Sequence, residues 1–319
     1  MGTLGRLAGL TTTDRLLLLY LGGLAVLASV RLPHPLATLA AIGALAAALL
    51  GVARGRSRSP LGTVVHDFFP VAGILGSFLL SGPVIAAANP RRWDAVMAAV
   101  DRSLFGALPE AWFGLLGRPD WLVDLASLFY ASFYLIPVAM ALALYRAGRR
   151  DDFQRFVFAV VGTFLVSYLG YLLFPTAGPR VPVALEAERL GGGAISVGLR
   201  GFLHWAERTQ LDAFPSGHTA LALVFAVFAW RMLPRWRVPV AVLAAGIVFA
   251  TVYLSLHYVI DLVAGAALAA AMPWTLPRLA RWVGPRPAGL PHAEVAQRPS
   301  SKARQRPDAQ PIRSNRPPR

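Results

Sequence analysis

Residues 155–174 read RFVFAVVGTFLVSYLGYLLF, with a single charged residue at the start and apolar side chains almost throughout. A helix needs about 20 such residues to cross the roughly 30 Å hydrocarbon core of a bilayer. Inside that core a helix satisfies its own backbone hydrogen bonds, which an irregular segment cannot do. The stretch therefore predicts a membrane-spanning helix.

Similar apolar runs recur along most of the 319-residue chain. Hydrophobic side chains make up 56% of it and charged ones only 15%, which is too apolar for a soluble domain. Eight spans are predicted, at about 15–31, 36–53, 68–88, 121–144, 155–174, 219–233, 238–256 and 258–276. We expect an all-α protein, a polytopic membrane helix bundle of about eight transmembrane helices.

The placement of the basic residues orients these spans. With the N-terminus inside, 22 of the 31 basic residues fall on the cytoplasmic side and 9 outside, and such an excess is typical of cytoplasmic loops. We therefore expect an integral protein of the cell (inner) membrane with both termini cytoplasmic. The same placement accounts for the net charge of +15, so no nucleic-acid partner is expected.

One candidate site motif is Phe214-Pro215-Ser216-Gly217-His218, directly before a predicted span. The amides around Ser216, Gly217 and His218 would lie at a helix N-terminus, where unpaired N–H groups and the helix dipole favour an anion. Gly217 would let a phosphate approach the backbone closely. An ordinary turn that only caps the helix is the alternative interpretation.

A second candidate motif is His257-Tyr258-Val259-Ile260-Asp261, which places an imidazole and a carboxylate four residues apart. On a helix the two share one face, and a carboxylate that accepts one imidazole N–H leaves the other nitrogen basic. Asp261 lies in an apolar run, where ionisable residues are usually functional. A purely structural His–Asp pair is the alternative. His66-Asp67 repeats the pair only superficially, on the cytoplasmic side, and we interpret it as interfacial.

The predicted topology places both motifs outside the cytoplasm, together with Arg180 in the long connection between the spans at 155–174 and 219–233. A guanidinium matches a phosphate oxygen pair in charge and geometry, although an isolated arginine at an interface also snorkels. Two histidines and one aspartate lack the usual spacing of metal ligands, so no metal and no other cofactor is expected. A serine-hydrolase triad would leave Arg180 without a role.

With these motifs the chain resembles the type 2 phosphatidic acid phosphatase superfamily, which includes the vanadium haloperoxidases. Pro215-Ser216-Gly217-His218 matches the second family motif in full, and His257 and Asp261 with the following Gly265 match the end of the third. The resemblance implies that His257, His218 and Asp261 are catalytic and that Arg180, Ser216 and Gly217 bind phosphate. It covers about residues 68–276 and implies a six-helix core.

Two cations of the family motifs are missing. The lysine of the first motif falls at Leu173, and the serine and arginine of the third fall at Ala250 and Thr251; Arg180 is followed by Val181 instead of proline. With fewer charges to neutralise it, a dianionic phosphomonoester is expected to lose more than a monoanionic diester.

Residues 101–106, 174–180 and 257–261 look more like the inositol phosphorylceramide synthase branch, although Gly217 follows the phosphatases, since that branch usually has leucine there. The branch implies transfer of a phospho-headgroup, of the inositol phosphate type, from a phospholipid to a lipid alcohol. The superfamily resemblance implies a phosphohistidine intermediate, and the predicted topology places the reaction at the extracytoplasmic leaflet. A phosphatase acting on a lipid phosphate or polyprenyl diphosphate, with water as acceptor, is one alternative. A lipid-binding or transport membrane protein without turnover is the other, and haloperoxidase chemistry fits poorly with the missing cations.

Three regions are expected along the chain. Residues 1–67 would form two additional N-terminal transmembrane helices, and residues 68–276 the six-helix catalytic core. Residues 277–319 are rich in proline and arginine and predict a disordered, basic cytoplasmic tail. The expected partners are the bilayer, a phospholipid or lipid phosphate substrate, and a lipid alcohol or water as acceptor, while the sequence leaves the oligomeric state open.

Overall fold

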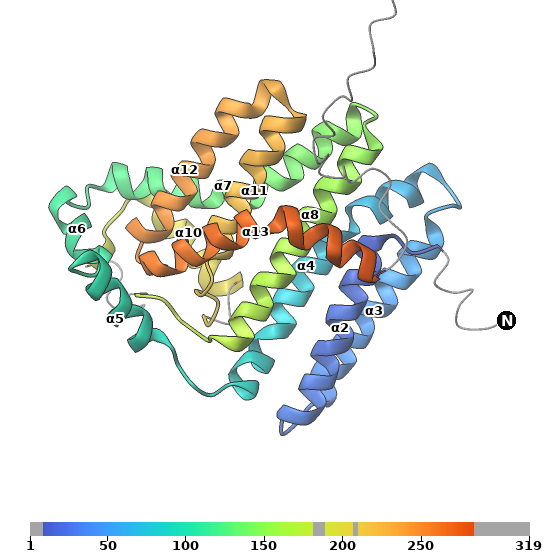
Figure 1. Cartoon of the computed structure of the whole chain (residues 1–319), viewed down its shortest axis with the longest axis horizontal. Helices are drawn as coiled ribbons and strands as arrows, with labels where there is room; N and C mark the ends of the chain where they lie inside the picture. Colours follow the sequence, from blue (N-terminus) through green and yellow to red (C-terminus); the bar gives the residue numbers. More distant parts are fainter. Residues whose placement is uncertain (1–8, 181–188, 207–209, 284–319) are drawn as a thin grey trace, which may run out of the picture. The chain divides into compact units, whose positions relative to one another are not determined.

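The structure is a computed structural model that describes residues 9–180, 189–206 and 210–283. Figure 1 colours the helices in sequence order, from α2 and α3 in blue to α13 in orange-red. The helices are α2 (Thr12–Arg31), α3 (Leu36–Gly55), α4 (Pro60–Ala88), α5 (Asp94–Phe105), α6 (Pro109–Leu116), α7 (Asp120–Arg146), α8 (Arg150–Leu173), α10 (Ala194–Ala206), α11 (Gly217–Met232), α12 (Arg237–Tyr253) and α13 (Val259–Val283).

The all-helical fold class is confirmed. Among the described residues, seven helices are long and apolar enough to cross a membrane: α2, α3, α4, α7, α8, the segment Pro234–Tyr253 that contains α12, and α13. The predicted eighth span is α11, an apolar helix of 16 residues. Within the described residues the chain forms no strand, only an isolated bridge between Thr176 and Asp212. The chain is therefore an integral membrane protein of the polytopic helical kind.

Two helix ends differ from the predicted boundaries. Helix α4 begins at Pro60, because Ser59 caps it by accepting a hydrogen bond from the Gly62 amide and proline suits a first helical turn. The boundary predicted between residues 67 and 68 therefore falls inside α4. Helix α13 continues through Pro273 and Pro277 to Val283, past the end predicted at 276. Residues 284–319 of the predicted tail lie outside the described residues.

The N-terminal helices α2 and α3 pack against each other and against α4 (Figure 1). A buried polar group joins α2 to α4: the ring of His66 lies 2.9 Å from Asp14 through Nε2 and 3.2 Å from Asp67 through Nδ1. Only 3% of His66 is exposed, so the ring is enclosed by the helices, and its interfacial position in the membrane stays a prediction. The sequence pair His66-Asp67 did not indicate that Asp14, 52 residues away, supplies a second carboxylate to the His66 ring.

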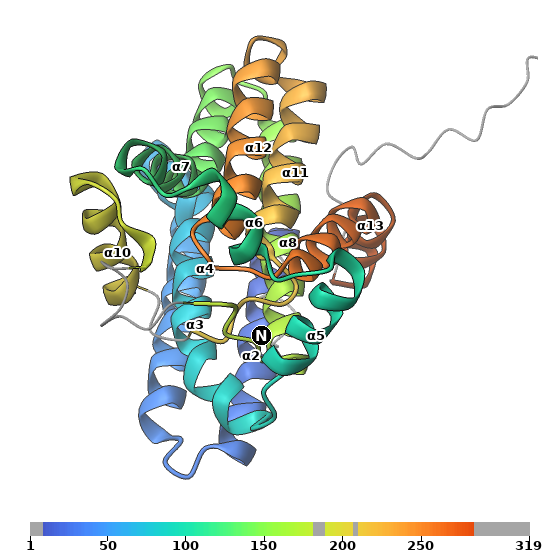
Figure 2. The same ribbon diagram turned by 90° about the vertical axis from the view of Figure 1, so that its left-hand side faces the viewer.

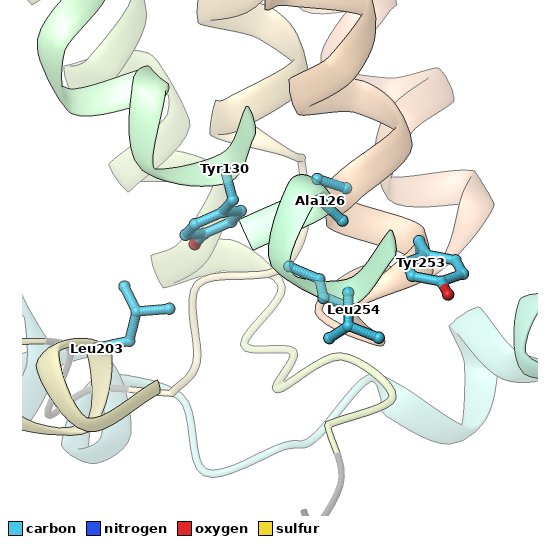
Figure 3. Packing of buried hydrophobic residues seen from close by; sticks show 7 residues of the cluster. Ala126, Tyr130, Leu203, Tyr253 and Leu254 are labelled. Atoms are coloured by element: carbon cyan, nitrogen blue, oxygen red, sulfur yellow. The ribbon is translucent and has the colours of Figure 1, made fainter. Parts of the chain in front are cut away.

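Three shorter helices lie beside the long ones: α5, α6 and α10, seen from another side in Figure 2. Helix α5 ends at Gly106, whose φ of 78° suits glycine at a helix C-terminus. Helix α10 packs against α7 through a buried cluster in which Leu203 joins Tyr130, Ala126, Leu254 and Tyr253 (Figure 3). The cluster ties α7 to the end of α12, directly before the second histidine motif.

Candidate active site

Three segments that are far apart in the sequence meet where α8 ends and where α11 and α13 begin. The bridge between Thr176 and Asp212 includes a hydrogen bond of 2.9 Å from the Ala213 amide to the Thr176 carbonyl. The Ser216 amide donates to the Asp261 carbonyl, also at 2.9 Å. The structure thus brings these three segments together at one end of the bundle.

His257 lies in the turn between α12 and α13 rather than on a helix. Its Nδ1 is 3.4 Å from Oδ2 of Asp261, which stands in the first turn of α13. The same carboxylate oxygen accepts a hydrogen bond of 2.9 Å from the Tyr258 amide, so Asp261 holds both the ring and the backbone beside it. His257 is 4% exposed and Asp261 fully buried. With Nδ1 directed at the carboxylate, Nε2 is the basic nitrogen.

His218 is the second residue of α11, and its ring centroid lies 5.7 Å from that of His257. Two rings from α7 hold it: Tyr130 at 4.6 Å and Phe133 at 4.2 Å between centroids. Its Nε2 is buried, and no described residue forms a hydrogen bond with it. A buried polar atom without a partner is costly, so this nitrogen is suited to a group that a substrate brings.

Ser216 and Gly217 form the start of α11. Ser216 is fully buried and caps the helix, with its Oγ accepting from the Thr219 amide at 3.2 Å. The capping alternative is therefore realised, yet the hydroxyl keeps its own hydrogen for donation. A Cβ at Gly217 would lie 2.5 Å from the Tyr171 hydroxyl, so a larger residue there would have to displace the end of the Tyr171 side chain.

Arg180 is anchored at both ends of its guanidinium. Its Nε donates to the Ala177 carbonyl at 3.0 Å, and its Nη2 to Asp212 at 2.9 Å. The loop that carries it also touches the His257 turn, because a Cβ at Gly178 would collide with the Leu256 carbonyl oxygen. Sequence reasoning missed Asp212, which offsets part of the positive charge predicted here.

The two positions of the missing cations differ in surroundings. Leu173 ends α8 with 63% of its surface exposed, whereas Thr251 is fully buried in α12. The Thr251 carbonyl accepts hydrogen bonds from the amides of Leu256 and His257, at 2.9 and 3.0 Å. An arginine at 251 would therefore have to displace packed side chains beside the backbone that supports His257.

Two further carboxylates, both on α5, were given no role by the sequence reasoning. Asp94 accepts hydrogen bonds from the amides of Ala177 and Gly178, and Asp101 from those of Val259 and Ile260. Their spacing of seven residues, which puts both on one face of a helix, was the available signal.

The chain is similar to a known protein family and to individual known proteins. The model of a family described as the PAP2 superfamily matches residues 95–275. A phosphoinositol dihydroceramide synthase from Bacteroides thetaiotaomicron is 27% identical over 193 residues, which cover 53% of this chain and 62% of the relative. A PA-phosphatase related-family protein from Dictyostelium discoideum is 22% identical over 244 residues, which cover 64% of this chain and 42% of the relative.

The chain thus spans less than two thirds of the length of either relative. No solved structure matches it.

Proposed function

The chain belongs to the PAP2 superfamily, and from that membership we propose that it is a membrane-embedded phosphotransferase that moves a phospho-headgroup between lipids. One observation carries the proposal. The rings of His218 and His257 lie 5.7 Å apart, and His257 is backed by a fully buried Asp261. That arrangement suits a nucleophile and a proton donor on either side of one phosphorus atom.

The reaction would run in two balanced steps. In the first, His257 Nε2 attacks phosphorus while the bond to the leaving lipid oxygen breaks, and His218 gives that oxygen a proton. Asp261 stabilises the positive charge that develops on the His257 ring. In the second, an acceptor hydroxyl attacks phosphorus, the phosphorus–nitrogen bond breaks, and the acceptor proton passes to His218.

The phosphoryl oxygens would be held by Arg180, by the Ser216 hydroxyl and by the amide of Gly217 at the N-terminus of α11. Such donors act most strongly when they are fixed in place before charge develops. Arg180 is fixed by Ala177 and Asp212, and Ser216 by its burial and its capping bond. Hydrogen-bond donors and one guanidinium suffice for this part of the proposal.

A lipid alcohol as acceptor and an inositol phosphate type headgroup are the finer part of the proposal. They are supported by the similarity to the phosphoinositol dihydroceramide synthase and by residues 101–106, 174–180 and 257–261. Hydrolysis of a lipid phosphate is the second candidate. Gly217 and the similarity to the PA-phosphatase related-family protein favour it.

Purified protein in phospholipid vesicles, given phosphatidylinositol and a ceramide, is expected to form the phosphoinositol derivative of the ceramide and diacylglycerol in equal amounts. Mass spectrometry of the lipid products measures both. A parallel reaction contains phosphatidic acid and no lipid alcohol. Turnover of phosphatidic acid far above that of every diester would make the chain a phosphatase, and no product in either reaction would leave a lipid-binding role.

We also propose that the site faces away from the cytoplasm, with both termini inside. The chain has no cysteine, so a single introduced thiol reports its own side of the membrane. We expect Ser103→Cys, at an exposed position of α5, to react with a membrane-impermeant maleimide from outside intact cells. Ser57→Cys, exposed between α3 and α4, is the matched control and should react only after the membrane is opened. The reverse pattern would invert the proposed orientation.

A further inference from the structure

Helix α5 presents one face to the candidate site. Asp94, Met97, Ala98 and Asp101 recur at the spacing of that face, and Met97 and Ala98 pack in a buried cluster with Tyr258, the residue after the nucleophile proposed above. The two carboxylates bracket this apolar contact. Each of them reaches a different loop of the site.

Asp101 holds the start of α13. Its Oδ2 accepts from the Val259 amide at 2.7 Å and its Oδ1 from the Ile260 amide at 2.9 Å. The side chain of Asp101 is fully buried. The first amides of a helix lack partners within the helix, so a carboxylate supplied from outside fixes both the position and the direction of its first turn. That turn contains Asp261, and only Tyr258 separates it from His257.

Asp94 holds the loop that leads to Arg180. Its Oδ1 accepts from the amides of Ala177 and Gly178, each at 3.0 Å. One residue earlier, the amide of Trp93, the N-cap of α5, donates to the Pro175 carbonyl at 3.1 Å, so a further hydrogen bond joins the loop to the start of α5. The Arg180 guanidinium takes its own position from the Ala177 carbonyl. Asp94 therefore controls Arg180 through the backbone of residue 177.

We propose that Asp94 and Asp101 are positioning residues, and that α5 is a rigid brace that sets the distance between the phosphate-binding loop and the histidine nucleophile. The inference rests on the proposed function and adds to it that residues outside the motifs fix the alignment of the two loops. Within the described residues, no other helix carries carboxylates that accept hydrogen bonds from backbone amides of both the Arg180 loop and the start of α13.

The two carboxylates are expected to affect different kinetic constants. Loss of the Asp101 contacts would let His257 and Asp261 move, and a misplacement of about 1 Å can lower turnover by roughly 100-fold. Loss of the Asp94 contacts would loosen the loop of Arg180 and so weaken the binding of phosphate groups. If the two carboxylates only stabilised the fold, both variants would show a lower melting temperature and a smaller active fraction, and neither would change kcat or KM selectively.

The test compares Asp101→Asn and Asp94→Ala in the full chain in detergent or vesicles. Asparagine at 101 keeps the shape of the side chain but turns one of the two acceptors into a donor that opposes a backbone amide. Alanine is used at 94 because Oδ1 alone accepts both 3.0 Å hydrogen bonds, and an asparagine oxygen could keep them. We expect Asp101→Asn to lower kcat by about 10- to 100-fold with KM changed less than about threefold. We expect Asp94→Ala to raise both KM and the inhibition constant of orthovanadate, a phosphate mimic, by about tenfold. Asp101→Glu, which keeps two acceptors, should recover part of the lost kcat.

Asp124→Asn is the matched control. Asp124 also accepts two amide hydrogen bonds at a helix start, from Gly193 at 3.0 Å and Ser196 at 2.9 Å, but it serves α10 and neither loop of the site. The kcat and KM of the Asp124→Asn variant should stay within about twofold of the wild-type values. An equal loss of kcat in Asp124→Asn and Asp101→Asn, or an unchanged kcat in Asp101→Asn, overturns the proposal.

Hydrogen exchange separates failure of the brace from failure of the proposed function. In Asp101→Asn the amides of Val259 and Ile260 should exchange at least about tenfold faster than in wild type, whereas exchange in the rest of α13 stays slow. If the wild-type protein turns over no lipid, the proposed function fails, and the hydrogen-exchange rates alone test whether Asp101 holds the start of α13. Unchanged exchange at residues 259 and 260 then overturns it.

Discussion

Replacement of His257 by alanine is expected to reduce lipid turnover by about 10³-fold or more, because removal of a covalent catalyst leaves only binding and positioning. Initial rates in the vesicle assay, normalised to folded protein by size-exclusion chromatography, measure the loss. The alanine leaves Asp261 without its ring partner, yet Asp261 keeps the Tyr258 amide, so the turn should stay folded.

His34→Ala is the control for this variant. His34 is exposed in the turn between α2 and α3 and should tolerate the change without loss of activity. More than about a tenth of wild-type activity in His257→Ala would contradict the nucleophile assignment. A lipid-binding or transport protein would show another pattern, in which lipid binding by His257→Ala equals that of wild type and no variant alters a chemical product.

The fold could be predicted from the sequence because a membrane restricts the conformations that an apolar segment can adopt. Each predicted span corresponds to a helix, since runs such as 155–174 have no alternative inside a bilayer. The ends were less readable. Pro60 and Pro277 look like boundaries, but proline is compatible with the first turn of α4, and α13 continues past Pro273 and Pro277.

Part of the site was readable as well. His218, His257 and Asp261 belong to local patterns, and the alternation of spans places those patterns at one end of the bundle. The side chains that hold backbone amides were not readable: Asp94 and Asp101 act on loops more than 80 residues away in the sequence. A carboxylate that binds a distant amide leaves no local pattern, because every residue except proline offers the same N–H.

Asp212 was missed for the same reason, and it changes the expectation for Arg180. A guanidinium 2.9 Å from a carboxylate presents less net charge to a substrate than an isolated one does. Together with Leu173 and Thr251 in place of two family cations, the pair makes the proposed phosphate subsite less positive than the family motifs imply. A monoanionic phosphodiester suits such a subsite better than a dianionic monoester.

We therefore expect Arg180→Ala to lower turnover by about 10²- to 10³-fold, the loss typical of removing one group that stabilises the transition-state charge. Arg180→Lys should recover little, because an ammonium lacks the planar fork that reaches Ala177, Asp212 and a phosphate oxygen together. Asp212→Asn is the informative partner: it removes the opposing charge while keeping an acceptor for Arg180, and it should shift preference from phosphatidylinositol toward phosphatidic acid. Turnover of the two lipids by wild type and all three variants tests this expectation. If the ratio stays unchanged in Asp212→Asn, the charge of the Arg180–Asp212 pair does not set the preference for a diester.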